Sequence, residues 1–182
     1  MQKIEESKSM KLKAGPCILR GSDKLKLNGI RTFIVKGDPV EKKRPRFRVI
    51  WPKKTKKPTI RKPIVKTYTD KATKEYEKKV RDAYLEEFPD EKPFEGEIAI
   101  LTKFYFPVCK SYTKKVKKMI SDGEMHPTKK PDNDNLLKIV QDALNNVAYI
   151  DDAQIVASYE QKLYTDRDEG YVLVTIKEYV PE

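Results

Sequence analysis

The sequence has few of the residues that form disulfide bonds or zinc sites. Its 182 residues include two cysteines, Cys17 and Cys109, and one histidine, His126. Neither cysteine has a second cysteine at the spacing of metal ligands. This pattern argues against a disulfide framework and against a zinc site, and a lone loop histidine is more often solvated than catalytic.

Long apolar runs are also missing. No stretch approaches the roughly 18 consecutive apolar residues that a membrane helix requires. Charges are scattered through residues 1–24, where a secretion signal would have a continuous apolar core. The sequence therefore predicts a cytoplasmic protein that does not span a membrane, and its length suits one globular domain with an extension.

The excess positive charge lies in one segment. Residues 36–66 hold 13 Lys and Arg against two Asp and Glu, which accounts for the whole net charge of +11, and the remainder holds 26 of each sign. Cationic side chains bind phosphates by releasing condensed counterions, and Phe47 and Trp51 are interleaved with them. This basic strip predicts a nucleic-acid-binding surface.

A solvated lysine-rich loop is the alternative, and acidic partners or membrane surfaces attract similar patches. The predicted DNA-binding residues are Lys42, Lys43, Arg44, Arg46, Arg48, Lys53, Lys54, Lys56 and Lys57.

The apolar pattern predicts one α/β (α+β) domain over residues 29–182, with a mixed β-sheet and about three helices. The clearest early strands are expected at 30–37 and 97–108, which are rich in β-branched and aromatic residues. Helices are expected at 70–88 and 111–120.

Two segments are expected to lie outside the regular elements. Five prolines in the basic strip cannot donate ladder hydrogen bonds, so most of the strip is expected to be loop and only residues 46–51 could pair. Residues 1–28 show no sustained period and are expected to form an N-terminal extension, either flexible or adding a strand.

Residues 148–165 and 170–180 form two alternating runs near the C-terminus. A short polar segment, TDRDEG, joins them. They are expected to pair as an antiparallel hairpin that ends the sheet.

The stretch PDNDNLLK, residues 131–138, places two aspartates where a helical period begins. That period predicts a helix over about 133–146. A helix N-cap explains one aspartate, but it leaves the second and the later pair Asp151-Asp152. Clustered carboxylates repel one another without a cation, and oxygen ligands suit Mg²⁺ or Mn²⁺.

A calcium-binding EF-hand loop is the rival explanation of this stretch. Its sixth position would be Leu137 where that loop has Gly, and its twelfth would be Ala143 where that loop has Glu, so the pattern does not fit.

Asp134, Lys138 and Asp142 are four residues apart and are expected to line one helix stripe.

Residues 129–155, KKPDNDNLLKIVQDALNNVAYIDDAQI, resemble the core of the RusA-type Holliday junction resolvases of bacteria and phages. The matching elements are D-x-D-N-x-x-K, then D-A-L, then D-D-x-Q-[IV]. A weaker match lies upstream, where residues 35–47 are similar to the family's G-x-P-x-x-x-x-R-P-R segment. Together these elements span residues 30–164.

The resemblance implies a homodimer that binds a four-way DNA junction and uses Mg²⁺ to nick two strands of like polarity symmetrically. It implies that Asp132, Asp134 and Asp152 bind the metal and that Lys138 is the catalytic lysine. Asp151 competes with its neighbour, because only one of two adjacent strand residues can face the site. Asp142 is either a supporting ligand or a salt-bridge partner of Lys138, and the salt bridge is favoured.

Two other functions stay open. One is a phage DNA-binding accessory protein without catalysis, in which the acidic cluster only orders the helix. The other is a nuclease of single-stranded or flap DNA, because the same carboxylates can hydrolyse any phosphodiester.

Overall fold

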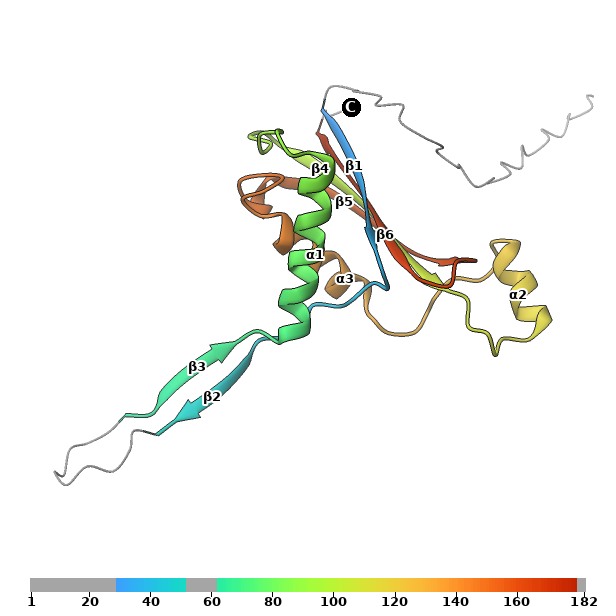
Figure 1. The fold of residues 1–182 in the computed structure, drawn as a ribbon, viewed down its shortest axis with the longest axis horizontal. Coiled ribbons are helices and arrows are strands. Elements are labelled where there is room, and N and C mark those ends of the chain that lie inside the picture. Colours follow the sequence, from blue (N-terminus) through green and yellow to red (C-terminus); the bar gives the residue numbers. More distant parts are fainter. Residues whose placement is uncertain (1–28, 52–61, 180–182) are drawn as a thin grey trace, which may run out of the picture.

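The computed structural model describes residues 29–51 and 62–179, which form a body and a projecting two-stranded arm (Figure 1). The strands are β1 (Ile30–Lys36), β2 (Arg46–Ile50), β3 (Ile64–Tyr68), β4 (Ile98–Pro107), β5 (Ile155–Thr165) and β6 (Tyr171–Glu178). The helices are α1 (Lys71–Glu87), α2 (Lys114–Ser121), α3 (Asn133–Leu144) and the 3₁₀ helix η1 (Asp152–Gln154).

The body contains a mixed four-stranded sheet with the order β1-β6-β4-β5. β6 is antiparallel to both of its neighbours, and β4 is parallel to β5. The predicted α+β class, the mixed sheet and the three α-helices are confirmed. No helix of the described residues is long and apolar enough to cross a membrane.

The predicted hairpin near the C-terminus is wrong. β5 and β6 run antiparallel but are not paired, because β4 lies between them. β4 alternates buried and partly exposed residues along most of its length and pairs on both sides. The loop at 166–170 crosses β4, a distance of about 10 Å that five residues span easily, and the Gly170 N–H donates to Asp38 Oδ1 at 2.7 Å beyond the end of β1.

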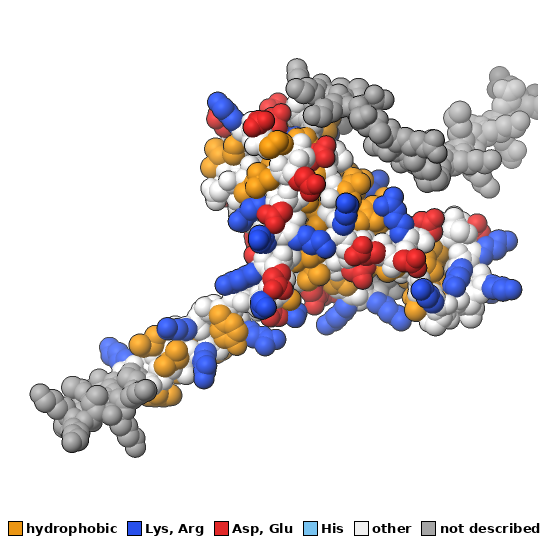
Figure 2. All heavy atoms as spheres, viewed as in Figure 1, with side chains coloured by type: hydrophobic (Ala, Val, Ile, Leu, Met, Phe, Trp, Pro, Cys, Tyr) orange, Lys and Arg blue, Asp and Glu red, His pale blue; other side chains and the backbone are white. Residues whose placement is uncertain are grey.

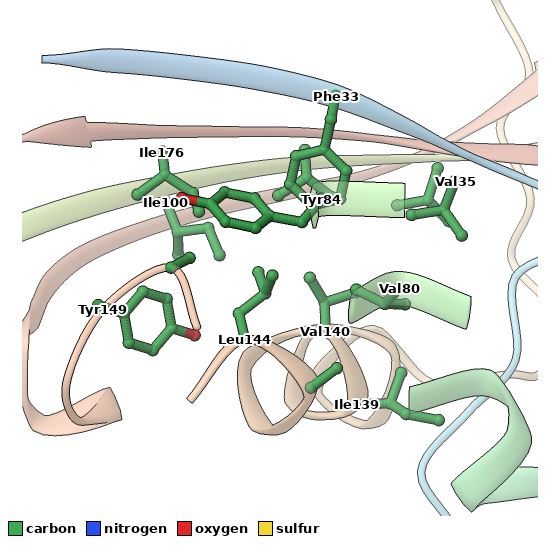
Figure 3. Close-up of a cluster of buried hydrophobic side chains, with 14 of the residues drawn as sticks. Phe33, Val35, Val80, Tyr84, Ile100, Ile139, Val140, Leu144, Tyr149 and Ile176 are labelled. Atoms are coloured by element: carbon green, nitrogen blue, oxygen red, sulfur yellow. The ribbon is translucent and has the colours of Figure 1, made fainter. Parts of the chain in front are cut away.

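The core lies between one face of this sheet and the helices α1 and α3 (Figure 3). α1 packs against α3 and β1, and α3 also contacts β5. Every second residue of β4 and β6 points into this layer, as the two-residue period of a strand requires. The largest fully buried side chains include Tyr84, Tyr149, Phe104, Leu136, Ile139 and Leu144. Packing of α3 on this core fixes which of its sides faces solvent.

The basic strip is more ordered than the sequence predicted. Residues 46–50 do pair, as expected, but their partner is β3, whose first three residues also belong to the strip. Pro45 precedes β2 and Pro63 precedes β3, so neither strand loses a donor within its own length. The two strands form the arm that extends away from the body (Figures 1 and 2). Residues 1–28 and the strip's Lys53, Lys54, Lys56 and Lys57 lie outside the described residues.

Candidate active site

The N-terminus of α3 presents two carboxylates to solvent. Asp132 is the N-cap residue, and its backbone carbonyl accepts from the Leu136 N–H at 3.1 Å, but its side chain makes no capping hydrogen bond. Asp134 lies in the first turn, and both side chains are exposed. The free N–H groups and the helix dipole at this end favour negative charge. Capping by the side chain therefore does not explain why an aspartate is found at position 132.

Lys138, one turn further along α3, bridges two carboxylates. Its Nζ lies 3.1 Å from Asp142 Oδ1 and 2.9 Å from Asp152 Oδ2. The hydrogen bonds to Asp152 and then to Asp142 raise the pKa of Lys138, and the bond from Lys138 lowers the pKa of Asp152. The lysine is therefore held as a cation beside the first residue of η1. The salt bridge expected between Asp142 and Lys138 is present.

Asp142 also binds a residue of the basic strip. The Lys42 Nζ contacts Asp142 and lies 2.9 Å from Glu77 Oε1 on α1. Burial opposes the charge on Lys42, but these hydrogen bonds outweigh it and raise its pKa. The Lys42 backbone N–H also donates to the Asn135 carbonyl at 3.0 Å. The strip is thus anchored to the candidate site through one lysine.

The neighbours Asp151 and Asp152 have different surroundings. The Asp151 side chain accepts from the Ala153 N–H at 2.8 Å, and the Gln154 side chain accepts from the Asp151 N–H at 2.9 Å. This reciprocal pair caps η1. Asp151 is therefore engaged in local structure, whereas Asp152 points at Lys138.

An open groove of about 780 Å³ joins the start of α3 to the basic strip and to the base of the arm. Its lining residues are Glu41, Lys42, Lys43, Arg44, Pro45, Arg46, Phe47, Tyr68, Lys130, Asp132 and Asn135. The Lys43 Nζ lies 2.8 Å from Asp70 Oδ2, and this hydrogen bond lowers the pKa of Asp70. Lys42 and Lys43 are paired with carboxylates. The lining also contains the cations Arg44, Arg46 and Lys130 beside Asp132, and cations of this kind complement a phosphate backbone.

The three predicted metal ligands fit a divalent cation in kind. All are carboxylates, which supply the oxygen donors that Mg²⁺ and Mn²⁺ prefer. They do not form a ready-made cage, because within residues 29–51 and 62–179 no three His, Cys, Asp or Glu side chains gather around one point. Asp152 is instead occupied by Lys138. The donor chemistry therefore fits, and of the three predicted ligands Asp132 and Asp134 are exposed to solvent.

The other residues that the sequence analysis considered lie along the groove, on the arm and in a loop. Arg44 and Arg46 line the groove, and Arg48 lies further out on β2. His126 is exposed in the loop between α2 and α3. Glu77 is the site residue that the sequence did not reveal, because its contact with Lys42 joins positions 35 apart and follows no local motif.

Comparisons with known proteins identify the family of the chain. A family model described as Endodeoxyribonuclease RusA matches residues 36–177, which include the basic strip, α3 and η1. The chain is also similar to the Uncharacterized protein YqaN of Bacillus subtilis (strain 168). The two are 32% identical over 144 residues, which cover 78% of this chain and 93% of the relative. The chain therefore belongs to the RusA family of endodeoxyribonucleases, the enzymes that resolve Holliday junctions.

Proposed function

We propose that this protein resolves four-way DNA junctions by paired symmetric nicks, with Mg²⁺ as its metal and Mn²⁺ as a substitute. The observation that best supports this proposal is that α3 presents Asp132 and Asp134 at its N-terminus and, one turn further along, Lys138 paired with Asp152. Asp132 also lines a groove bordered by the basic strip. A DNA-cleaving enzyme acts where DNA is found, so the cytoplasmic location expected from the sequence is part of this proposal.

In this proposal Asp132, Asp134 and Asp152 hold the metal. A bound divalent cation neutralises charge that develops on the phosphate and makes water a better nucleophile. The carboxylates fix that cation against the strand, and the groove cations hold the flanking phosphates. Lys138 places a positive charge where the phosphate becomes more negative, and the ion pair with Asp142 orients its ammonium group.

A cleavage assay on four substrates separates this function from its alternatives. The purified protein is incubated with a synthetic four-way junction, a flap, a single strand and a duplex, each with Mg²⁺ and with EDTA. We expect nicking of the junction alone, and only with the metal. Binding of the junction without nicking would favour an accessory protein, and faster cutting of the flap or single strand would favour a different nuclease.

Paired cutting requires two active sites, and each chain supplies one set of site residues. We therefore expect a homodimer with two-fold symmetry, the arrangement that matches two symmetric cuts. Sedimentation at micromolar protein concentration should give twice the chain mass. A chain that stays monomeric both alone and with junction DNA would contradict this prediction.

The basic strip should set the salt dependence of DNA binding. Replacing Lys53, Lys54, Lys56 and Lys57 by Ala is expected to weaken binding to every DNA form. It should also flatten the plot of log K against log salt by about 0.9 for each phosphate that the variant no longer neutralises. Filter binding or fluorescence anisotropy across a salt series measures both effects. Wild-type affinity together with a wild-type slope would mean that these lysines are only solvated.

A further inference from the structure

The arm formed by β2 and β3 has two chemically different faces. The register pairs Arg48 with Lys66 and Val49 with Val65, and adjacent strand residues point to opposite sides. One face therefore carries the cations Arg46, Arg48 and Lys66, together with Ile50, Ile64 and Tyr68. The other carries Phe47, Val49, Val65 and Thr67, and Trp51 follows in the same alternation. This second face has no charged side chain among the described residues.

The uncharged face is open to solvent. Phe47 is 72% exposed, Trp51 68%, Val65 60% and Val49 46%. Figure 2 shows hydrophobic side chains along the arm with cations beside them. A lone pair of strands is at best marginally stable in water, and a contiguous apolar patch of this kind marks a binding surface. Two exposed aromatic side chains in this patch favour a partner with flat apolar surfaces.

The position of the arm identifies the chemistry of that partner. Arg46, Phe47 and Tyr68 belong to the arm and also line the groove that contains Asp132. DNA held in the groove therefore also contacts the arm. The cations on the other face of the arm complement the phosphates of that DNA. The flat apolar surfaces of DNA are the faces of bases that have lost a stacking neighbour, and these occur at a branch point.

We propose that the uncharged face of the arm stacks on unpaired or unstacked bases at the branch point of the DNA, while its cationic face binds the adjoining phosphates. This inference rests on the proposed function, because it concerns the same substrate. Stacking on an aromatic ring tolerates any base sequence, because every base has a π-face. Apolar side chains also act as wedges between base steps that are already weakened. The arm thus distinguishes branched DNA from duplex.

Trp51 gives a direct signal, because it is the only tryptophan in the chain. Its fluorescence is titrated with a four-way junction and with a duplex of the same arm sequence, both in EDTA so that no strand is cut. Stacking on bases should quench the emission with the junction, and the duplex should leave it nearly unchanged at saturation. Equal emission changes with both DNA forms would overturn the proposal.

A pair of double variants tests the two faces separately. Phe47→Ala with Trp51→Ala should lower junction affinity about tenfold or more, the scale that base–aromatic stacking contributes. Duplex affinity and the salt slope should stay unchanged, because every phosphate-binding cation is still present. Ile50→Ala with Ile64→Ala removes apolar surface from the opposite face and should leave the junction preference intact. Equal reductions in both double variants would mean that the arm is merely disordered, and the proposal would fail.

Two further measurements identify the other outcomes. Trp51→Phe with Phe47→Tyr keeps both aromatic rings and should restore the junction preference; failure to restore it would contradict stacking. If the double alanine variant instead changes the sedimentation mass from dimer to monomer, the face binds a second copy of the chain and the proposal is wrong. A wild-type protein that cuts junctions without the Trp51 signal would overturn this inference alone and leave the proposed function standing.

Discussion

Asp134→Asn is expected to lower the rate of junction cleavage by at least ~10²-fold, the scale seen when one preorganised electrostatic group is removed. Asn has nearly the same shape as Asp, and position 134 is exposed in the first turn of α3, so the fold should survive. The change removes one of the negative charges that would hold the metal. Asp132→Asn and Asp152→Asn should have the same effect, which single-turnover cleavage at saturating protein concentration measures.

Binding should respond in the opposite direction. Without metal, the three aspartates repel the scissile phosphate, so each Asn variant should hold junction DNA as tightly as the wild type or more tightly. Asp151→Asn is the matched control, because that side chain caps η1 rather than facing Lys138. It should keep wild-type cutting. Loss of cutting in Asp151→Asn with normal cutting in Asp152→Asn would reverse this assignment.

Lys138→Ala is expected to lower cleavage on a similar scale, at least ~10²-fold, but without any gain in affinity for the junction. It removes a cation that pairs with Asp142 and Asp152, so negative charge near the phosphate becomes less compensated. The lack of a gain in junction affinity distinguishes Lys138→Ala from the aspartate variants. Gel-shift titration in EDTA gives the affinity, and single-turnover assays in Mg²⁺ give the rate.

Lys71→Ala is the control for loss of one positive charge. Lys71 is 89% exposed on α1 and pairs only with Glu75 among the described residues, so its replacement should change neither rate nor affinity. A Lys138→Ala protein that matches this control in both measurements would exclude Lys138 from catalysis.

The sequence predicts the elements of this fold better than it predicts their partners. The period of apolar residues in α3 and the alternation in β4 are local, so the sequence indicated both. Which strands pair is decided by contacts between distant residues. β4 lies between β5 and β6, and its buried residues Ile98, Ile100 and Phe104 belong to the same core as residues of α1 and α3. The sequence therefore predicted the two strands near the C-terminus correctly and their pairing incorrectly.

The candidate site shows the same difference between local patterns, which the sequence predicts, and long-range contacts, which it does not. The spacing of Asp134, Lys138 and Asp142 places them on one helix stripe, and the bridge between Lys138 and Asp142 follows from that spacing. The contact of Lys42 with Asp142 joins residues 100 positions apart, so no local pattern predicts it. The sequence indicated that residues 46–51 could pair, but it did not reveal their partner β3. The prolines of the strip indicated a loop there, although Pro45 and Pro63 stand outside the two strands.

The most direct test maps the nicks on a four-way junction whose four strands are labelled one at a time. In Mg²⁺, the wild-type protein should cut two strands of like polarity at symmetric positions, and DNA ligase should seal the products. Asp134→Asn should bind the same junction and leave all four strands intact. If the wild-type protein leaves the junction uncut in both Mg²⁺ and Mn²⁺, or if Asp134→Asn cuts at the wild-type rate, the carboxylates at the start of α3 are not the active site of a resolvase.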